Sequence, residues 1–507
     1  MKLNYKRTVF VGFAFFLICA FWQAYDTTIP LILTNKFGLS QTASGIVMAL
    51  DNVLALFMLP LFGTISDRHR GRLGRRTPFI LIGTLAAAIL FTGLSFADNA
   101  QLRALDTAAA IDDPQALAVL YDSQRDAELM TPEGERFVLS QCFTEEEFCA
   151  IRSDDGQENY TDYVVPVRQA HAAAVTKSHP GALIAFVGML LLLLLAMATF
   201  RSPAVALMPD VTIKPLRSKA NAVINLMGSA GGILVLVLGM VFATSSVRNS
   251  MMSYTAFFAV ISGIMLLALG LFCWQVREKR FVAEMQRDSL RYGIAEEEAD
   301  GQGKKLSAPE RRSLCFLLAS IILWFMGYNA VTSKYSVYAS NILHKDYNLT
   351  LILAQAAAIA AYLPVGILSS RFGRKKTILA GVAMLGVAFL MGCFARESTP
   401  DMLMNAMFVL AGVGWATINV NSFPMVVELC RGGDVGKYTG IYYTASMAAQ
   451  TVTPMLSGRL MDRLGMTTLF PYATVFVALA FVTMLFVRHG DSRPVARAGL
   501  EALNVED

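Results

Sequence analysis

Charged side chains are scarce in this chain of 507 residues: Asp, Glu, Lys and Arg make up 16% of it, while hydrophobic residues make up 55%. A soluble protein of this length would expose too many apolar side chains at that ratio, so we expect a polytopic membrane protein. The seven Cys and five His show no CxxC or His/Cys spacing, which argues against a metal site. A GxxxxGK phosphate loop and a Ser/His/Asp arrangement are also missing, which argues against an ATP-driven pump and against an enzyme. We therefore expect no cofactor.

Apolar runs of about 20 residues recur along the chain, and each is long enough to cross the hydrocarbon core of a bilayer. Strands of a membrane barrel would be shorter and would alternate, so we interpret the runs as helices. The prediction is an all-α membrane protein with twelve transmembrane helices. The expected spans are 9–33, 44–66, 77–97, 181–208, 219–244, 253–276, 313–339, 350–370, 376–395, 402–427, 438–460 and 468–488.

Basic residues are unevenly placed among the connections. Five Arg lie within 67–76, four Lys or Arg within 371–376, and nine within 277–312. Lys and Arg accumulate in the cytoplasmic loops of membrane proteins, so we place these loops and both termini in the cytoplasm of a cell-membrane protein. The net charge of +5 reflects this bias and gives no reason to expect nucleic-acid binding.

The connection 98–180 differs from the others, because it is long and holds 16 Asp or Glu against six Lys or Arg. By the topology above it is an extracytoplasmic insert between helices three and four. Cys142 and Cys149 lie in it, seven residues apart, in a compartment where disulfides persist. We predict that they form a disulfide; the alternative is a pair of free thiols.

The two halves of the chain repeat each other. Asp67 aligns with Ser370 at an offset of 370 − 67 = 303, and Asp210 aligns with Glu428 at 428 − 210 = 218. The difference, 303 − 218 = 85, is close to the length of the acidic insert. We therefore expect two pseudo-symmetric six-helix bundles, of the kind that lets a carrier open first to one side and then to the other. The expected parts are 1–97 with 181–276 (first bundle), 98–180 (insert), 277–312 (cytoplasmic linker), 313–488 (second bundle) and 489–507 (cytoplasmic tail).

The basic loop 63–76, of the form G-x-x-x-D-R-x-x-x-R-x-G-R-R, and its degenerate copy 366–376 resemble the signature loop of the major facilitator superfamily. Within that superfamily, Pro60–Arg68, Arg201–Asp210 and Lys219–Gly228 are similar to segments of the sucrose–proton symporters and of the neighbouring glycoside–pentoside–hexuronide cation symporters. The resemblance implies a saccharide carried together with H⁺ or Na⁺.

Three isolated charges lie within apolar runs of the first half, where an ionisable group costs several kcal/mol unless it is paired or hydrated. Asp26, beside Trp22 and Tyr25, would accept hydrogen bonds from sugar hydroxyls while the rings stack on the sugar. Asp51 would be the proton or cation site, with Asp26 contributing to the coupling. Arg201 matches an Arg that the resemblance to sucrose carriers ties to both substrate and coupling.

Each of these charges also has a structural interpretation. Asp51 would brace helix packing, Asp26 would pair with Lys334 across the two halves, and Arg201 would be the ion-pair partner of another acid. In the second half, neutral polar and aromatic residues within spans suit sugar hydroxyls, although any of them is as well suited to bonding between helices. The candidates are Trp324, Tyr328, Asn329, Gln355, Asn419 and Asn421.

A second group of charges lies at the cytoplasmic ends of the helices. We expect these residues to stabilise the closed inner gate and not to bind substrate, since a carboxylate at a helix end near an Arg holds two elements together. They are Asp67, Arg68, Arg75, Asp210 and Glu428.

The function predicted from the sequence is sugar uptake by H⁺ symport, carried out by a monomer in the lipid bilayer. One alternative is an exporter or exchanger of another small solute. Another is a non-transporting membrane sensor that binds a partner through the acidic insert.

Overall fold

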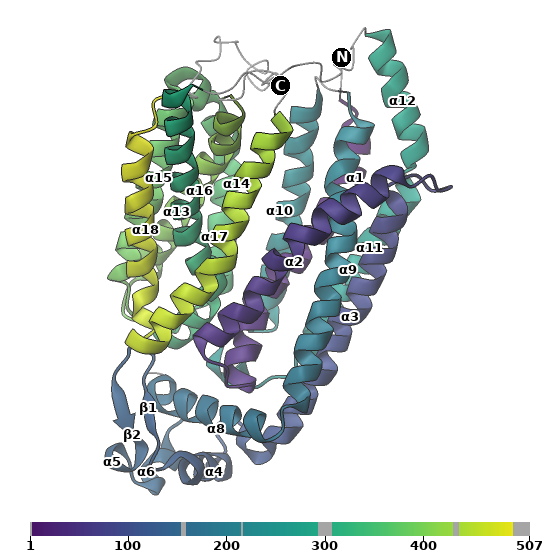
Figure 1. Cartoon of the computed structure of the whole chain (residues 1–507). Coiled ribbons are helices and arrows are strands. Elements are labelled where there is room, and N and C mark those ends of the chain that lie inside the picture. Colours follow the sequence, from purple (N-terminus) through teal and green to yellow (C-terminus); the bar gives the residue numbers. More distant parts are fainter. Residues whose placement is uncertain (1–2, 154–158, 214–215, 293–306, 429–434, 490–507) are drawn as a thin grey trace.

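The computed structural model describes residues 3–153, 159–213, 216–292, 307–428 and 435–489. Its long helices form two bundles that stand side by side (Figure 1). The first bundle consists of α1 (Tyr5–Leu31), α2 (Gln41–Arg68), α3 (Thr77–Leu105), α9 (Gly181–Val211), α10 (Arg217–Val241) and α11 (Thr255–Gln275). The second consists of α13 (Ala308–Tyr338), α14 (Tyr347–Phe372), α15 (Arg374–Cys393), α16 (Asp401–Glu428), α17 (Val435–Leu464) and α18 (Leu469–Leu485). The twelve-helix prediction is confirmed for the described residues.

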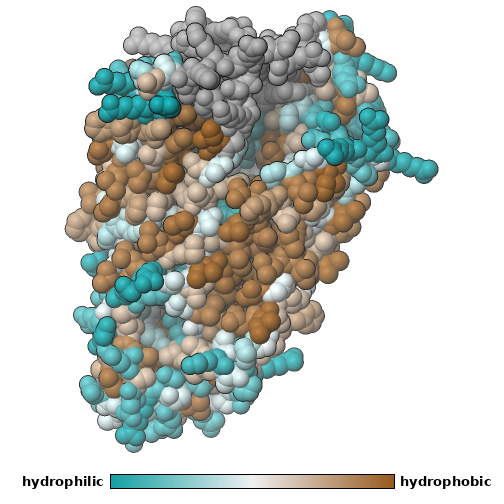
Figure 2. All heavy atoms as spheres, viewed as in Figure 1, coloured by the Kyte–Doolittle hydropathy of each residue, from teal (hydrophilic) through white to brown (hydrophobic). Residues whose placement is uncertain are grey.

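Ten of the described helices are long and apolar enough to cross a membrane. On the face shown in Figure 2, apolar residues cover most of the middle, and hydrophilic residues gather toward the ends. Large apolar side chains such as Phe96, Leu267 and Trp274 are more than two-thirds exposed. Such exposure is favourable in lipid and unfavourable in water, so the outer surface of the bundles fits a bilayer.

Each bundle has its own apolar core. Phe21, Phe91 and Phe258 lie in the core of the first bundle, while Trp324 and Phe470 lie in that of the second. The helices begin at polar caps: Ser40 caps α2 by accepting from the Ala43 amide, and Asp346 caps α14 in the same way. The end of α1 continues as a π-turn, Ile32–Lys36, and the end of α13 as another, Ala339–Leu343. The two halves therefore share this detail of backbone geometry.

The acidic insert is a folded unit at one end of the molecule, which we call the insert end (Figure 1). Its core includes Leu117, Leu120, Phe137, Phe148 and Val167. Its elements are η2 (Asp106–Ala109), α4 (Pro114–Gln124), the antiparallel strands β1 (Glu128–Met130) and β2 (Arg136–Val138), α5 (Leu139–Cys142), α6 (Glu145–Ala150), η3 (Tyr160–Val164) and α8 (Val165–Ser178).

The predicted start of the insert at residue 98 differs from the structure, because α3 continues to Leu105. Asp98 directly follows the predicted third span, 77–97. However, its carboxylate is fully buried and lies 2.6 Å from the ammonium group of Lys36, so the charge is compensated inside the bundle. The insert proper therefore begins after Leu105.

The opposite end of the molecule, which we call the linker end, carries α12 (Glu278–Arg291). This helix follows α11 directly and forms the first part of the predicted linker. Short 3₁₀ turns, η5 (Val247–Asn249) and η7 (Met466–Thr468), lie at the insert end. The second part of the linker, 293–306, and most of the tail, 490–507, lie outside the described residues.

Candidate functional site

The three isolated charges of the first half come together in the structure. Asp26 lies on α1, Asp51 on α2 and Arg201 on α9, and all three are half-buried. Their charges act on one another, with Arg201 attracting both carboxylates. The side-chain amide of Asn52 also donates to Asp51 Oδ1 at 2.7 Å. This cluster therefore holds two carboxylates and one guanidinium between three helices of one bundle.

Trp22 is the aromatic neighbour of this cluster. The guanidinium carbon of Arg201 lies 5.2 Å from the centre of the Trp22 ring, a cation–π contact that holds the arginine in place. A small cavity lined by Trp22, Asp51, Arg201 and five apolar residues has a volume of about 10 Å³, the room of one water molecule. Tyr25, in contrast, is buried, and its hydroxyl donates to the carbonyl of Met48 at 3.4 Å. Tyr25 therefore joins α1 to α2 instead of presenting a free surface.

Tyr328 on α13 and Trp415 on α16 form the aromatic part of the site in the second bundle. Their rings are parallel, with centres 3.6 Å apart and planes 1° apart, and Phe325 meets Trp415 edge-on at 5.2 Å. Tyr328 and Trp415 are half-buried, and the Tyr328 hydroxyl lies within electrostatic reach of Asp26. Trp415 was not among the predicted residues, and its stacking on Tyr328 puts it beside one of them.

Trp324 is a correction to the predicted site. It is fully buried in the core of the second bundle, as its repeat counterpart Phe21 is in the first. Successive residues of a helix point about 100° apart, so Trp324 and Phe325 cannot both face the other bundle. Its indole contributes to stability and not to a binding surface.

The amides of the second half have different surroundings. Asn421 is buried, and its side-chain NH₂ donates to the Thr417 carbonyl at 2.9 Å, so it serves its own helix. Asn329 does the same toward Phe325 at 2.8 Å, although it is half-buried. Asn419, the repeat counterpart of Arg201, is half-buried and has no hydrogen bond within the described part of the chain. Asn419 is therefore the best placed of the three to meet a solute.

Gln355 on α14 donates from Nε2 to Gln23 Oε1 on α1, so these two amides connect the bundles. Both lie eight residues from the insert end of their helices, about 12 Å along the helix axis. A Cβ added to Gly232 of α10 would stand 3.0 Å from Gln355 Oε1, so a glycine here leaves room for the pair. The sequence had singled out Gln355 but not Gln23, since nothing in the repeat marks position 23.

Apart from this pair, hydrogen bonds between described residues of the two bundles lie at the insert end. Asp462 of α17 accepts from the backbone amides of Gln41 and Thr42 at the start of α2, at 2.6 and 2.8 Å. Lys334 is fully buried and donates to the Gln41 carbonyl at 2.7 Å. The alternative pairing of Lys334 with Asp26 is therefore absent. Helices α2 and α17 lie together at this end and diverge toward the linker end (Figure 1).

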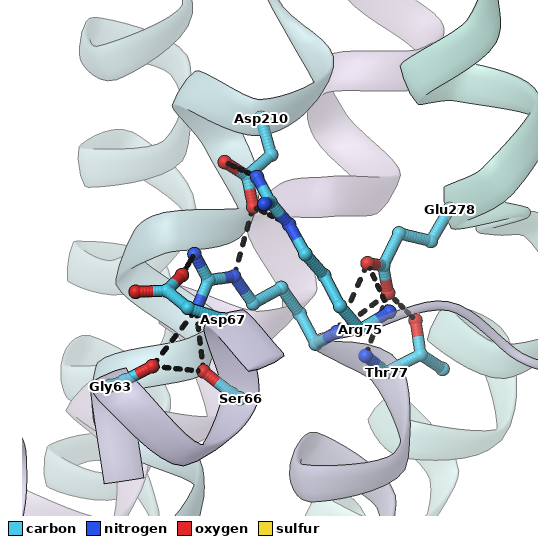
Figure 3. A network of polar contacts seen from close by, with 8 residues as sticks. Gly63, Ser66, Asp67, Arg75, Thr77, Asp210 and Glu278 are labelled. Atoms are coloured by element: carbon cyan, nitrogen blue, oxygen red, sulfur yellow. Dashed lines mark hydrogen bonds and ion pairs between the residues drawn. The ribbon is translucent and has the colours of Figure 1, made fainter. Parts of the chain in front are cut away.

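Three of the predicted gate residues, Asp67, Arg75 and Asp210, belong to one network at the linker end of the first bundle (Figure 3). Asp210 accepts from Arg75 Nη2 at 2.6 Å and from Arg76 Nε at 2.9 Å, and Arg76 also pairs with Asp67. Arg76 was not among the predicted residues, although it is the more buried of the two arginines. Arg68 is exposed and takes no part in the network, and the side chain of Glu428 lies outside the described part of the chain.

Glu278, the first residue of α12, completes this network. Its carboxylate accepts from the backbone amides of Arg75 at 2.7 Å, Arg76 at 3.0 Å and Thr77 at 2.8 Å. It thereby satisfies the free amides at the start of α3 and places a negative charge at the positive end of that helix. The linker helix is thus anchored to the basic loop.

The predicted disulfide is not formed, because Cys142 and Cys149 are both free. Cys142 ends α5 and Cys149 lies in α6, and the extended backbone of Phe143 and Thr144 separates these two short helices.

Comparison with known proteins identifies the family that the chain resembles. The pattern of the family described as Major Facilitator Superfamily matches residues 11–119 and 317–504. A segment of 85 residues is 32% identical to the "Uncharacterized symporter YnaJ" of Bacillus subtilis; it makes up 16% of this chain and only 18% of that protein.

Solved structures resemble nearly the whole chain, and two of them serve as examples. The inward open conformation of the xylose transporter XylE from E. coli has a TM-score of 0.57 and 15% identity, covering 96% of this chain and 97% of its own. A mutant of the nucleoside transporter NupG has a TM-score of 0.52 and 14% identity, covering 96% and 100%. At these identities the likeness is one of fold.

Proposed function

Because the chain belongs to the major facilitator superfamily of membrane carriers, we propose that it moves a saccharide across the cell membrane together with a proton. Membership of this family makes it a multi-pass transporter and not an enzyme. The finer proposal is a sugar symporter similar to the sucrose–proton and glycoside–pentoside–hexuronide groups. It is supported by the chemistry of the residues between the two bundles.

The charge of the cluster formed by Asp26, Asp51 and Arg201 carries the proposal. Two ionised carboxylates and one guanidinium leave a net charge of −1, and an uncompensated charge at membrane depth costs several kcal/mol. One bound cation makes the cluster neutral. If the carrier changes between its two open states only when the cluster is neutral, this conformational change requires the bound cation. Transport of the solute is then coupled to transport of that cation. A proton bound at Asp51 satisfies this requirement, and Na⁺ is the second candidate.

The polar and aromatic candidates of the two bundles suit a polyhydroxylated solute. Asp26 and Gln355 offer hydrogen-bond acceptors, Gln355 and Asn419 offer donors, and the half-buried Trp22 and Trp415 offer aromatic surface. A sugar ring presents hydroxyls at its edge and C–H groups on its faces, and thus matches both kinds of surface. Tyr328 would place its hydroxyl near Asp26 across the gap between the bundles.

The distribution of basic residues assigns the orientation. The linker end carries the loops rich in Lys and Arg, so we place it and both termini in the cytoplasm, with the insert outside. The hydrogen bonds of Asp462 and Lys334 join the two bundles at the insert end, which supports access to the site from the linker end. Both bundles lie in one polypeptide, which suits a monomeric carrier.

Uptake into proteoliposomes tests the proposal. Labelled mono- and disaccharides are offered with an imposed proton gradient, an imposed Na⁺ gradient, or none. We expect uphill uptake with the proton gradient and loss of it in Asp51→Asn, which should still exchange internal for external sugar. The control is Glu147→Gln in the exposed part of the insert, which should transport normally. Full uphill uptake by Asp51→Asn would refute the assignment. Uptake only with a reversed gradient would favour the exporter.

A further inference from the structure

The insert is fixed to the first bundle. Gln169 of α8 donates to Asn35 Oδ1 at the end of α1 at 2.9 Å, and Gln101 of α3 donates to Thr176 of α8 at 3.0 Å. Gly38 lies so close to α8 that an added Cβ would stand 2.3 Å from the Ala173 nitrogen. These contacts place α8 directly on the helix ends of the first bundle, so the insert should move with that bundle as one body.

The tip of the β-hairpin, residues 131–135, contacts the second bundle instead. The backbone amide of Met466 donates to the Pro132 carbonyl at 2.7 Å, and the Thr467 hydroxyl lies 3.5 Å from the Glu133 carbonyl. Met466 lies two residues after Leu464, the end of α17. A segment of the first half thus reaches past its own bundle to bond the backbone of the other.

Two glycines allow this approach. Gly134 has φ +103°, and an added Cβ would stand 2.5 Å from the Leu464 carbonyl oxygen. Gly465 has φ +92°, and an added Cβ would stand 2.4 Å from the Glu133 carbonyl oxygen. Any other residue at either position would be strained by its backbone angle and would push the two backbones apart. We call this backbone-to-backbone meeting the latch contact.

The latch contact lies beside the closed outer gate. Asp462, three residues before Gly465, holds the start of α2, and a cavity of about 130 Å³ enclosed by the hairpin, α8, α17 and the start of α2 separates the two contacts. Opening the insert end requires the end of α17 to move away from the first bundle. The hairpin, which moves with the first bundle, must then release Gly465.

We propose that the β-hairpin of the insert is a latch that holds the carrier closed at the insert end and must release α17 in each transport cycle. The inference rests on the alternation between two open states that the proposed function requires. It assigns the insert a role within the molecule: it sets the balance between the two states, so that weakening the latch contact favours the state open at the insert end.

Accessibility of a buried cysteine tests the latch without any solute. Ser340 lies at the end of α13, is buried, and donates to the Ser245 carbonyl of the first bundle, so it is covered only while this end is closed. The reporter is Ser340→Cys in a background where Cys142, Cys149 and Cys393 are replaced by Ser. We expect Gly134→Ala and Gly465→Ala to raise its labelling by a membrane-impermeant maleimide about tenfold.

Glu128→Gln is the matched control, because it removes an exposed ion pair with Arg136 on the same hairpin without touching α17. It should leave labelling unchanged. Equal labelling of the reporter with and without the glycine substitutions would overturn the latch, whether or not the protein carries sugar.

A crosslink tests the release step. In the double variant Glu133→Cys, Thr467→Cys, oxidation should form a disulfide that lowers uptake at least tenfold. Reduction of this disulfide should restore uptake. Asn35→Cys with Gln169→Cys crosslinks the insert to its own bundle and should leave uptake intact. Normal uptake by the oxidised latch pair would overturn the proposal. Lack of uptake in all variants, oxidised or reduced, would instead count against the proposed function. In that case the labelling experiment would still test whether the hairpin holds the insert end closed.

Discussion

The carboxylate of Asp462 in the second bundle accepts a hydrogen bond of 2.6 Å from the backbone amide of Gln41, the first residue of α2 in the first bundle. A negative charge from one half of the molecule thus stabilises the positive end of a helix of the other half. The same carboxylate accepts from the Thr42 amide and is attracted by the buried Lys334. We expect this contact between Asp462 and α2 to break when the insert end opens.

Asp462→Asn should therefore favour the state open at the insert end. The substitution keeps the size of the side chain and removes the charge that interacts with the helix dipole, which contributes about 1 kcal/mol, or about fivefold in an equilibrium. We expect labelling of the Ser340→Cys reporter to rise by about that factor. Asp401→Asn is the control, since its carboxylate pairs only with Lys345 near the same end of the second bundle. Equal labelling in both variants would contradict this role of Asp462.

The buried ion pair of Lys36 and Asp98 should contribute strongly to stability. Lys36 also donates to the Met252 carbonyl at 2.7 Å, and Asp98 accepts from the Tyr254 amide. Removing one partner leaves an uncompensated buried charge, which costs about 3–5 kcal/mol. We expect Asp98→Ala to lower the melting temperature in detergent by several degrees. Arg136→Ala, which breaks an exposed pair, should have no measurable effect, and the double variant Lys36→Met, Asp98→Leu should recover much of the loss.

Substitution of Trp415 should mainly affect sugar binding, and substitution of Trp324 should mainly affect protein stability. Trp415→Ala removes a half-buried ring that we propose contacts the sugar, a contact of about 1 kcal/mol, so KM for the sugar should rise by about fivefold. Trp324→Ala opens a cavity in the core of the second bundle and should cost about 3–5 kcal/mol of stability without a comparable change in KM. Uptake kinetics and melting curves of the two variants provide the comparison. A KM effect confined to Trp324→Ala would refute the assignment of the site.

Glu278→Ala should loosen the anchor between the linker helix and the basic loop. Three backbone amides at the start of α3 lose their acceptor, which costs about 2 kcal/mol. We expect faster amide hydrogen exchange at residues 75–80 and in the first turn of α12, measured by mass spectrometry. Lys279→Ala changes the neighbouring exposed residue and should leave exchange unchanged. Protection that persists in Glu278→Ala would show that the anchor is elsewhere.

The number and placement of helices could be predicted from the sequence, because the bilayer requires each span to be long, apolar and helical. Asp26, Asp51 and Arg201 could be singled out for the same reason, since a charge in an apolar run is rare and costly. The repeat offset also predicted two bundles and an insertion in the first of them. All of these signals are either local in the sequence or repeated along it. They can be recognised without knowing which helices are in contact.

The partners of these residues were decided by the tertiary structure. Lys334 bonds to Gln41 and not to Asp26, Asp98 lies in a buried pair instead of at a helix end, and Trp324 turns into a core while Trp415 turns to the site. The contact of the insert with α17 joins residues about 330 positions apart (466 − 132 = 334). These contacts depend on the rotation of each helix and on how closely the two bundles approach. Packing over the whole molecule determines both, so no single stretch of the sequence specifies the contacts.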